Sequence, residues 1–501
     1  MGTRQVSIRA DEGLFLGLAK QNMLFHQCIF ELCDNAIAAA VDGRKPNIDI
    51  FLNPVADDPD KVDVWVCDNG RGMDDQQLET ALQPGRVPTS NSRLNEHGFG
   101  LKNSLATLSG GNGEWTLWTK ASGKEPCKVS GPFSSTMEIV SGAFFPSEAF
   151  LPSDSSTIIF VRVKLSFLRT VQGRGGPSSN LSSLRMWLIE HLGVTYRGFL
   201  EQDPETQDTS ARIKVSINSD TKVVPPVPVP FGNVTTKYID VTLGTSTFRL
   251  IYKFGTLDEE LRDQLLYKNE KAKYYYQNNQ TTQGIDIRLG RRVIATRQFE
   301  TIWKTSNGKA PLTRHNNYND FLGELLIPED IPRGILTTVN NKTDFNLDDP
   351  NWNIIFDELN SKYRPPEKIR ETTEAGLRDK WKSMLQNTNP DDEITSEQSV
   401  WPSGTRIDVY RKSAIDHSII IYELKAGKGA PIHLYQLKMY WDGLLLQGEQ
   451  PKEAVLMVED YDEKLQEMAN IMNQMPTPNL NNSPSLPYNF KIEKHRDKGL
   501  A

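Results

Sequence analysis

The chain has 501 residues, of which 38% are apolar and 24% charged, and its formal net charge is -7. A chain of this length is longer than most single domains with one hydrophobic core, so we expect two or three domains. The composition predicts an ordinary globular protein. It excludes a chain that is disordered throughout and a uniformly basic nucleic-acid-binding surface, while a local basic groove stays compatible with it.

The first residues contain no apolar stretch of the kind that a secretory signal needs. No segment approaches the roughly 18 apolar residues of a membrane span. We therefore expect a cytoplasmic protein.

Residues 20–42 carry apolar side chains at helical spacing and predict the first helix. Strands then alternate with loops, which predicts an α/β layer. The predicted strands are residues 48–52, 62–67, 115–119 and 157–163. The fold class expected for the whole chain is α/β (α+β).

Domain boundaries are predicted from shifts in composition. Gly, Pro and Ser are concentrated at 174–183, before a helical pattern at 184–192, so the first domain is expected to span 1–190. A strand-rich domain over 191–362 follows, in which the proline-rich run 225–230 cannot be an interior strand. A charged helix at 367–385 begins a third domain, 363–475. Residues 476–501 are expected to be a polar C-terminal extension rich in Pro and Asn, in which 488–492 could form a strand.

Three short motifs in the first domain suggest a nucleotide site. Glu31 and Asn35 lie four residues apart, hence on one helical face, where a carboxylate and an amide suit a water molecule and Mg²⁺. The second motif follows a predicted strand and joins an acceptor to two glycines that permit close backbone approach. It comprises Asp68, Gly70, Gly72 and Met73. The third is a glycine-rich turn at the start of a helix, which favours an anion. It comprises Gly98, Gly100, Leu101 and Lys102.

Together, in this order, the three motifs resemble the GHKL ATPase superfamily of DNA gyrase B, MutL, heat-shock chaperone ATPases and MORC proteins, with the third most like the MORC form. The resemblance covers about residues 20–165 and implies a Bergerat-type ATPase α/β sandwich that binds ATP and Mg²⁺. It implies that Glu31 is the general base, that Asn35 coordinates Mg²⁺ and that Asp68 receives the adenine amino group. Gly70, Gly72 and Met73 would shape the pocket, while Gly98, Gly100, Leu101 and Lys102 would hold the phosphates. Residues 76–97 would form a lid, and Thr157 would be the last motif, although Ser156 replaces its usual glycine.

The middle domain resembles the transducer of MutL-like proteins in two places. Residues 336–345 resemble the loop that carries a lysine, here Lys342, to the phosphate site. Residues 285–294 form a strand-turn-strand pattern with Gly290-Arg291 at its turn. A surface lysine in a polar loop explains Lys342 equally well.

The last domain carries a second set of charged residues. Period-two geometry places Glu423 and Lys425 on one face at the end of an apolar strand, and Asp408 lies on a preceding strand. Two carboxylates that converge on a divalent cation, with a lysine near the attacking water, suit phosphodiester cleavage. Gln436 and Tyr440 share one face of the following helix. A solvated Glu-x-Lys charge pair is the alternative.

This set resembles the PD-(D/E)XK nuclease superfamily, and Gln436 with Tyr440 adds a likeness to its RecB-type branch. The resemblance covers about residues 367–450 and implies a restriction-endonuclease-like α/β domain. It implies that Asp408 and Glu423 bind Mg²⁺, that Lys425 assists the water and that Gln436 and Tyr440 support the site. Glu374 is chosen over Glu371 and Glu367 as the glutamate of the first helix, and Ile407 replaces the proline of the motif name.

The two resemblances together predict an ATP-gated, Mg²⁺-dependent DNA endonuclease, a homodimer through ATP-dependent closure, in prokaryotic defence against phage or plasmid DNA. Basic clusters at 268–273 and 288–297 could face double-stranded DNA, and a solvated surface explains them equally well. Two alternatives remain. One is a MORC-like clamp that remodels DNA without cutting it, and the other is a chaperone-like ATPase that acts on protein partners.

Overall fold

The computed structural model contains three mixed β-sheets with helices packed against them, so the predicted α/β class is confirmed. It divides into two compact units, Met1–Pro365 and Pro366–Ala501. No helix in the described part of the chain is long and apolar enough to cross a bilayer. The structure describes residues 12–20, 22–86, 94, 98–143, 146, 154–173, 180–206, 208–267, 272–305, 310–339, 345–365, 374–401, 405–479 and 485–500.

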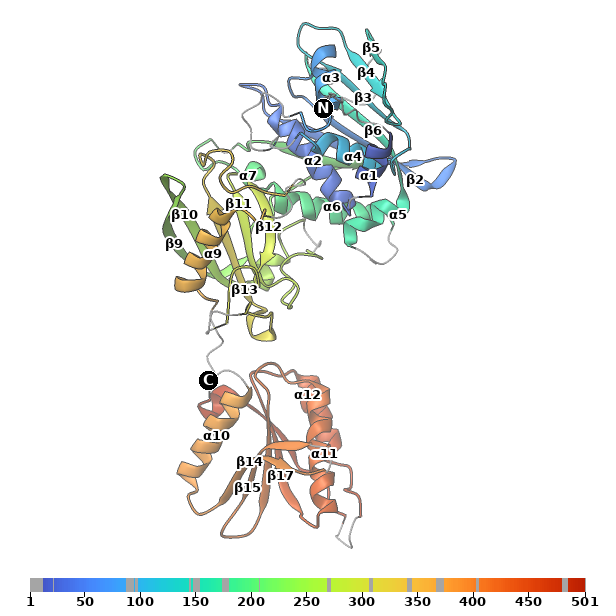
Figure 1. Cartoon of the computed structure of the whole chain (residues 1–501). Helices are drawn as coiled ribbons and strands as arrows, with labels where there is room; N and C mark the ends of the chain where they lie inside the picture. The colour runs from blue at the N-terminus through green and yellow to red at the C-terminus, as the bar shows by residue number, and fades with distance from the viewer. Residues whose placement is uncertain are drawn as a thin grey trace, which may run out of the picture. The chain divides into compact units, whose positions relative to one another are not determined.

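The first sheet of unit 1 has eight strands in the order β5-β4-β3-β6-β2-β1-β7-β8. Four of them coincide with the predicted strands, and the helices lie along one face of the sheet (Figure 1). The strands are β1 (Asn47–Val55), β2 (Asp58–Asp68), β3 (Trp115–Lys120), β4 (Cys127–Ser130), β5 (Ile139–Ser141), β6 (Ser156–Lys164), β7 (Arg212–Ile217) and β8 (Asp220–Val223). The helices are α1 (Glu12–Ala19), α2 (Phe25–Ala38), α3 (Asp75–Leu82), α4 (Gly100–Leu108), α5 (Leu165–Leu168), α6 (Leu181–Thr195) and α7 (Arg197–Leu200).

The predicted first helix is shorter than expected. Residues 22–24 are not helical, and α2 begins at Phe25 after Leu24 adopts an extended backbone. The side chain of Gln27 accepts a hydrogen bond from Leu24 N at 2.8 Å and so caps this start. Helical spacing alone could not locate this start, because the apolar side chains continue across it.

The predicted boundary near residue 190 falls inside α6 and is wrong. Leu188, Ile189 and Leu192 of this helix are fully buried in the core of the first sheet. Beyond it, β7 pairs in parallel with β1, which extends the first sheet to residue 223. The change in composition at 174–183 therefore does not mark the end of the first layer. The proline-rich run 225–230 lies outside the strands, as predicted.

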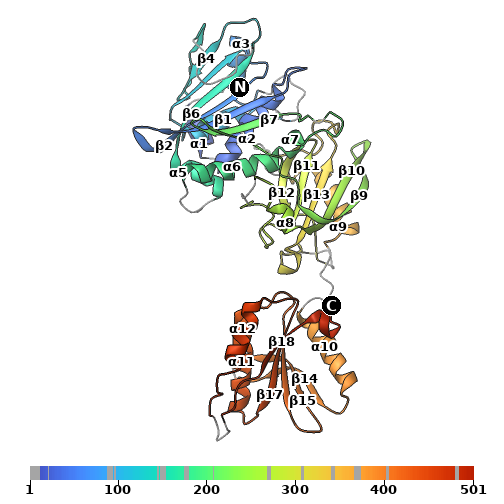
Figure 2. The same ribbon diagram turned by 180° about the vertical axis from the view of Figure 1, so that it is seen from behind.

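The second sheet of unit 1 has the order β12-β11-β13-β10-β9 (Figure 2). The strand-turn-strand pattern predicted at 285–294 is β11 and β12, and Gly290 at the turn has a φ of +58°, which favours glycine. Helix α9 covers a core that contains Trp303 and Trp352. The elements are β9 (Phe231–Leu243), β10 (Ser246–Leu257), α8 (Glu259–Arg262), β11 (Gly284–Leu289), β12 (Arg292–Gln298), β13 (Phe321–Ile327) and α9 (Pro350–Lys362).

A buried ionic network joins α7 to the second sheet. The Arg197 guanidinium lies 2.9 Å from Asp286 Oδ2 and 2.7 Å from Glu324 Oε1. Its Nη1 also donates to the hydroxyl of Tyr276 at 3.0 Å. Only 1% of the Arg197 side chain is exposed, and it is the closest cation to both carboxylates, although Arg288 also lies 3.8 Å from Glu324 Oε1.

Replacing Arg197 with methionine should lower the free energy of unfolding of unit 1 by about 3–5 kcal/mol, because two buried carboxylates lose their partner. Urea unfolding followed by tryptophan fluorescence measures the effect. Arg249→Met is the matched control, since Arg249 pairs with Asp240 on the surface of the same sheet. The control should unfold at nearly the wild-type urea concentration. Equal midpoints for the two variants would contradict the network's importance.

Unit 2 contains one sheet in the order β14-β15-β16-β17-β18. Helix α10 packs on one face of this sheet, and α11 and α12 pack on the other (Figure 1). The elements are α10 (Glu374–Thr388), β14 (Glu393–Ser399), β15 (Arg406–Lys412), β16 (Ile419–Leu424), α11 (Pro431–Leu446), β17 (Pro451–Val458), α12 (Glu463–Met472) and β18 (Phe490–Lys494).

The C-terminal residues belong to this sheet, so the predicted separate extension from 476 is corrected. Strand β18 pairs in parallel with β17. Tyr488 and Phe490 are buried, and both rings pack against Trp441 of α11. The strand that residues 488–492 could form corresponds to β18, whereas the polar composition gave no sign that it joins the sheet.

Candidate ATP site and candidate nuclease site

Glu31 lies on α2 against the start of α4. A Cβ atom placed on Gly100 would lie 2.0 Å from Glu31 Oε2, so a side chain at position 100 would displace the carboxylate. Glu31 is almost fully buried, whereas Asn35, one turn later, is half-buried. The fold thus brings the first and third motifs together, although 69 positions separate these residues in the chain.

Asp68 ends β2 beside the strand that carries Thr157. The two residues are direct partners in the antiparallel register of β2 and β6. Burial raises the pKa of Asp68 to about 6, although hydrogen bonds from the backbone of Gly70 and Thr157 act to lower this pKa. The Gly70 N–H donates to Asp68 Oδ1 at 2.8 Å. Thr157 therefore lies beside Asp68 although Ser156 stands in place of the usual glycine.

Gly72 and Met73 follow as a tight turn against β3. Gly72 has a φ of +62°, and a Cβ atom there would lie 1.9 Å from the carbonyl oxygen of Lys120. Met73 N donates to the Thr119 hydroxyl at 2.8 Å, and that hydroxyl lies 3.2 Å from the hydroxyl of Thr157. Only glycine fits at position 72, because both the backbone angle and the space exclude a side chain.

The third motif forms the first turn of α4. Gly98 has a φ of +66°, and Gly100, Leu101 and Lys102 begin the helix, where free backbone N–H groups favour an anion. Lys102 is buried, and its ammonium donates to the carbonyl of Ala81 in α3 at 2.9 Å. Burial lowers the pKa of Lys102 to about 8.

Residues 20–133 match the family model described as histidine kinase-, DNA gyrase B- and HSP90-like ATPase. The N-terminal part of the chain is a GHKL-type ATPase domain. The match ends before β6 and covers well under half of the chain. No curated protein matches the sequence significantly. A GHKL domain supports ATP binding, typically with Mg²⁺, and ATPase activity.

Several predicted positions around the GHKL domain cannot be placed. Lys342 lies outside the described residues, as do 87–93 and 95–97 of the predicted lid and 268–271 of one basic cluster. Helix α3 occupies the first part of the lid segment. Within the cluster at 288–297, Arg292 is buried and does not belong to the surface of the domain.

Arg292 instead bonds to the GHKL domain. Its Nε donates to Asp34 Oδ1 at 2.8 Å, and both side chains are almost fully buried. The Tyr196 hydroxyl also donates to Asp34 Oδ1 at 2.8 Å. The second sheet thereby contacts α2 between Glu31 and Asn35. In the sequence, only the position of Asp34 between Glu31 and Asn35 pointed to a functional role for Asp34. No sequence pattern near Asp34 identified Arg292 as its partner.

The candidate nuclease residues meet at the ends of β15 and β16. Lys425 Nζ lies 2.9 Å from Glu423 Oε1 and 3.2 Å from Glu374 Oε2. Asp408 Oδ2 accepts a hydrogen bond from Leu424 N at 2.8 Å. The structure therefore brings Glu374 of α10 to the pair, while Glu367 and Glu371 lie outside the described residues.

The two carboxylates perturb each other. Burial, followed by the charge of Asp408, raises the pKa of Glu423 to about 7. Lys425 and Tyr440 act in the opposite direction and lower it by a smaller amount. Burial also raises the pKa of Asp408. Although burial acts to lower the pKa of Lys425, its ion pairs with Glu423 and Glu374 raise it overall. Lys425 is therefore protonated at neutral pH.

Two oxygen atoms in this region suit a hard cation. Glu423 Oε2 and Gln436 Oε1 are buried, and neither has a hydrogen-bond donor. Mg²⁺ prefers such oxygen ligands. No cluster of three or more His, Cys, Asp or Glu side chains that could hold a metal occurs among the described residues. Asp408 and Glu423 thus fit the two-carboxylate site that the sequence predicts, with water or DNA oxygens left to complete it.

Proposed function

We propose that the chain is an ATP-gated, Mg²⁺-dependent DNA endonuclease. The observation that carries this proposal is the arrangement of Asp408, Glu423 and Lys425 where the start of β15 meets the end of β16, in the same chain as a GHKL domain. The pKa of Glu423 supports a site rather than a surface pair, because a solvated glutamate would not be perturbed to this extent.

In the ATPase reaction, Glu31 orients the attacking water and accepts its proton. Asn35 would hold Mg²⁺ when ATP is bound, and Asp68 would accept a hydrogen bond from the adenine amino group. The N-terminus of α4, from Gly98 to Lys102, holds the phosphates through backbone N–H groups. The close approach of Glu31 to Gly100 supports the proposed role of Glu31 beside the phosphates.

In the cleavage reaction, Asp408 and Glu423 would hold Mg²⁺, and the ion would supply Lewis-acid chemistry there. Lys425 is a hydrogen-bond donor because its ammonium is protonated, and so it orients the water or the scissile phosphate. Gln436 and Tyr440 of α11 support Glu423. We further propose that ATP-dependent closure forms a homodimer. The proposed substrate is phage or plasmid DNA in a prokaryote. Both parts of the proposal rest on the domain architecture alone.

The test measures cleavage of supercoiled and linear DNA with Mg²⁺, in the presence of ATP, a non-hydrolysable ATP analogue or no nucleotide. Gating predicts that the cleavage rate differs between nucleotide states. Equal rates in all three would remove the gating, and DNA retention without cleavage would favour a MORC-like clamp. ATPase activity that is indifferent to DNA and stimulated by an unfolded protein would favour a chaperone-like ATPase.

ATP affinity should be highest between about pH 6 and pH 8. Asp68 has a raised pKa, so it is ionised and able to accept the adenine amino group only above about 6. Lys102 has a lowered pKa, so it is positively charged only below about 8. One pH unit beyond each limit should weaken binding about tenfold. Calorimetric titration with ATP at pH 5, 7 and 9 measures this, and Lys102→Met should remove only the alkaline limit. A flat profile would contradict these two roles.

A further inference from the structure

A cavity of about 160 Å³ lies within unit 1, between α2 of the GHKL domain and β12 of the second sheet. His26 and Gln27 line it from α2, and Arg292 and Arg297 line it from β12, with Tyr274 and Tyr275 beside them. The proposed ATPase and nuclease reactions use neither His26 nor Arg297. The lining therefore combines two cationic side chains and several polar groups with apolar residues such as Phe30 and Ile294, and it is separate from the residues of both candidate sites.

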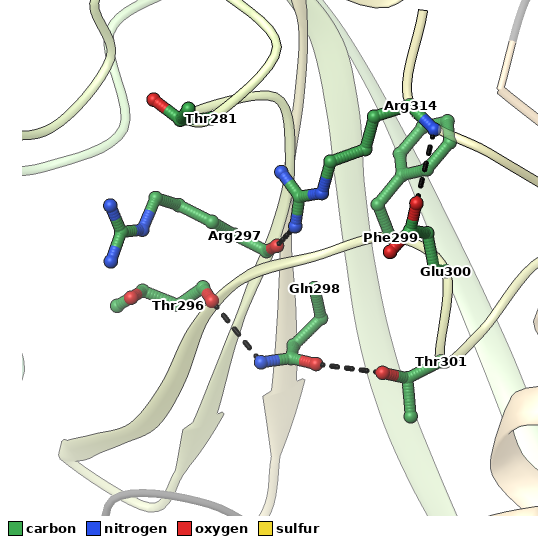
Figure 3. Close-up of a pocket in the computed structure, with 8 residues that line it drawn as sticks. All are labelled: Thr281, Thr296, Arg297, Gln298, Phe299, Glu300, Thr301 and Arg314. Carbon is green, nitrogen blue, oxygen red and sulfur yellow. Dashed lines mark hydrogen bonds between the residues drawn. The ribbon is translucent and has the colours of Figure 1, made fainter.

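A neighbouring pocket of about 280 Å³ shares Arg297 but is a weaker candidate. Figure 3 shows that the guanidinium groups of Arg297 and Arg314 lie apart, with Arg314 directed to the carbonyl oxygen of Arg297. Arg314 also donates to the carbonyls of Gln280 and Gln283. Its donors are thus already used by the backbone, whereas those of Arg297 are not.

Arg297 is a half-buried cation without a carboxylate partner among the described residues. Its guanidinium donates to the Tyr274 hydroxyl at 3.1 Å and lies 4.5 Å from the ring centre of Tyr274 and 5.5 Å from that of Tyr275. By contrast, Arg292 in the same wall is paired with Asp34. The nearby carboxylate of Asp286 accepts from the backbone N–H of Arg297 and is ion-paired with Arg197, so the Arg297 guanidinium itself can still pair with an anion in the adjacent space.

His26 adds a second polar group to the cavity. The side chain is 7% exposed, and its Nδ1 has no hydrogen-bond partner. Its ring stacks on His191 at 3.9 Å, and the Tyr275 hydroxyl and the Val171 carbonyl fix the ring of His191 in turn. Burial, followed by the charges of His191 and Arg297, lowers the pKa of His26. A neutral imidazole can donate one hydrogen bond to an anion.

We propose that this cavity binds a small oxyanion, such as inorganic phosphate, between the guanidinium of Arg297 and the imidazole of His26. A cation would meet two arginines, and an apolar ligand would leave both groups without partners. The volume lies below the roughly 300–1,000 Å³ of sites for drug-sized ligands, so free phosphate fits better than a nucleotide. The bound anion would adjoin Arg292, whose partner Asp34 neighbours Asn35, so occupancy can act on the ATPase helix.

The test is calorimetric titration of the full chain with inorganic phosphate, without Mg²⁺ and in the Lys102→Ala background, which weakens phosphate binding at the nucleotide site. We expect saturable binding of one phosphate per chain. Arg297→Gln should weaken it at least about tenfold, as expected for loss of a charge-assisted hydrogen bond, and His26→Phe should weaken it several-fold while keeping the stack on His191. Arg249→Gln, on the surface of the same sheet, should bind as the background does.

Titration with phenyl phosphate, a phosphate monoester, is the second measurement. Binding of phenyl phosphate would show that the cavity accepts the phosphate group of a larger molecule, and binding of inorganic phosphate alone would show that its ligand is the free ion. Circular dichroism confirms that each variant is folded. If Arg297→Gln does not fold, the phosphate affinity of His26→Phe tests the proposal instead. Absence of phosphate binding in the background, or affinity unchanged in the folded variants, would overturn the proposal. Because Mg²⁺ and DNA are absent, this outcome is independent of whether the chain is a nuclease.

Discussion

Glu31→Gln should reduce the rate of ATP hydrolysis by about 10²- to 10⁴-fold, the usual contribution of a general base. Glutamine keeps the shape of the side chain that packs against Gly100, but its amide cannot accept a proton from water. ATP affinity should therefore stay close to the wild-type value. Steady-state phosphate release and calorimetric titration with ATP measure the two quantities.

The matched control for this variant is Glu114→Gln. Glu114 lies in the same domain, and 58% of its side chain is exposed in an ion pair with Arg162. We expect wild-type hydrolysis from the control. Hydrolysis at the wild-type rate by Glu31→Gln would show that another group activates the water, and loss of ATP binding would instead assign Glu31 a structural role.

Asp408→Asn should abolish Mg²⁺-dependent DNA cleavage, with a loss of at least about 100-fold, since a metal ion stabilises the transition state by several kcal/mol. The amide keeps an oxygen that can accept the hydrogen bond from Leu424 N, so the fold should persist. ATP hydrolysis should remain, because the GHKL domain does not contain this residue. A plasmid-nicking assay and a Mg²⁺ titration measure the losses.

Asp460→Asn is the control, because Asp460 forms a surface ion pair with Lys494 in the same unit. It should cleave DNA as the wild type does. Wild-type cleavage by Asp408→Asn would place the nuclease site elsewhere. Cleavage by neither the wild type nor the control, in any nucleotide state, would leave the clamp as the better function.

Local motifs of the GHKL domain could be predicted because each lies on one helix or one strand. Helical spacing places Glu31 and Asn35 on one face of α2. In unit 2, strand spacing likewise predicts that Glu423 of β16 and Lys425, directly after this strand, lie on one face. Turn glycines such as Gly72 are likewise identified by their neighbours in the sequence. These patterns reflect backbone geometry, which is the same in any tertiary context.

Boundaries and long-range partners could not be predicted in this way. The helix around residue 190 was taken as the end of a domain, yet β7 returns to pair with β1 beyond it. The segment from 476 was expected to be separate, yet β18 completes the last sheet. In both cases the deciding contact joins residues far apart in the sequence, and composition carries no information about such contacts.

The sequence by itself determined the α/β class, the position of the GHKL domain and the residue types of two candidate sites. Only the tertiary structure decided which groups meet: Glu31 with Gly100, Arg292 with Asp34, and Lys425 with both Glu423 and Glu374. The physical reason is that periodicity fixes which face a side chain occupies, whereas the charge environment of that side chain depends on chain segments that only folding brings close.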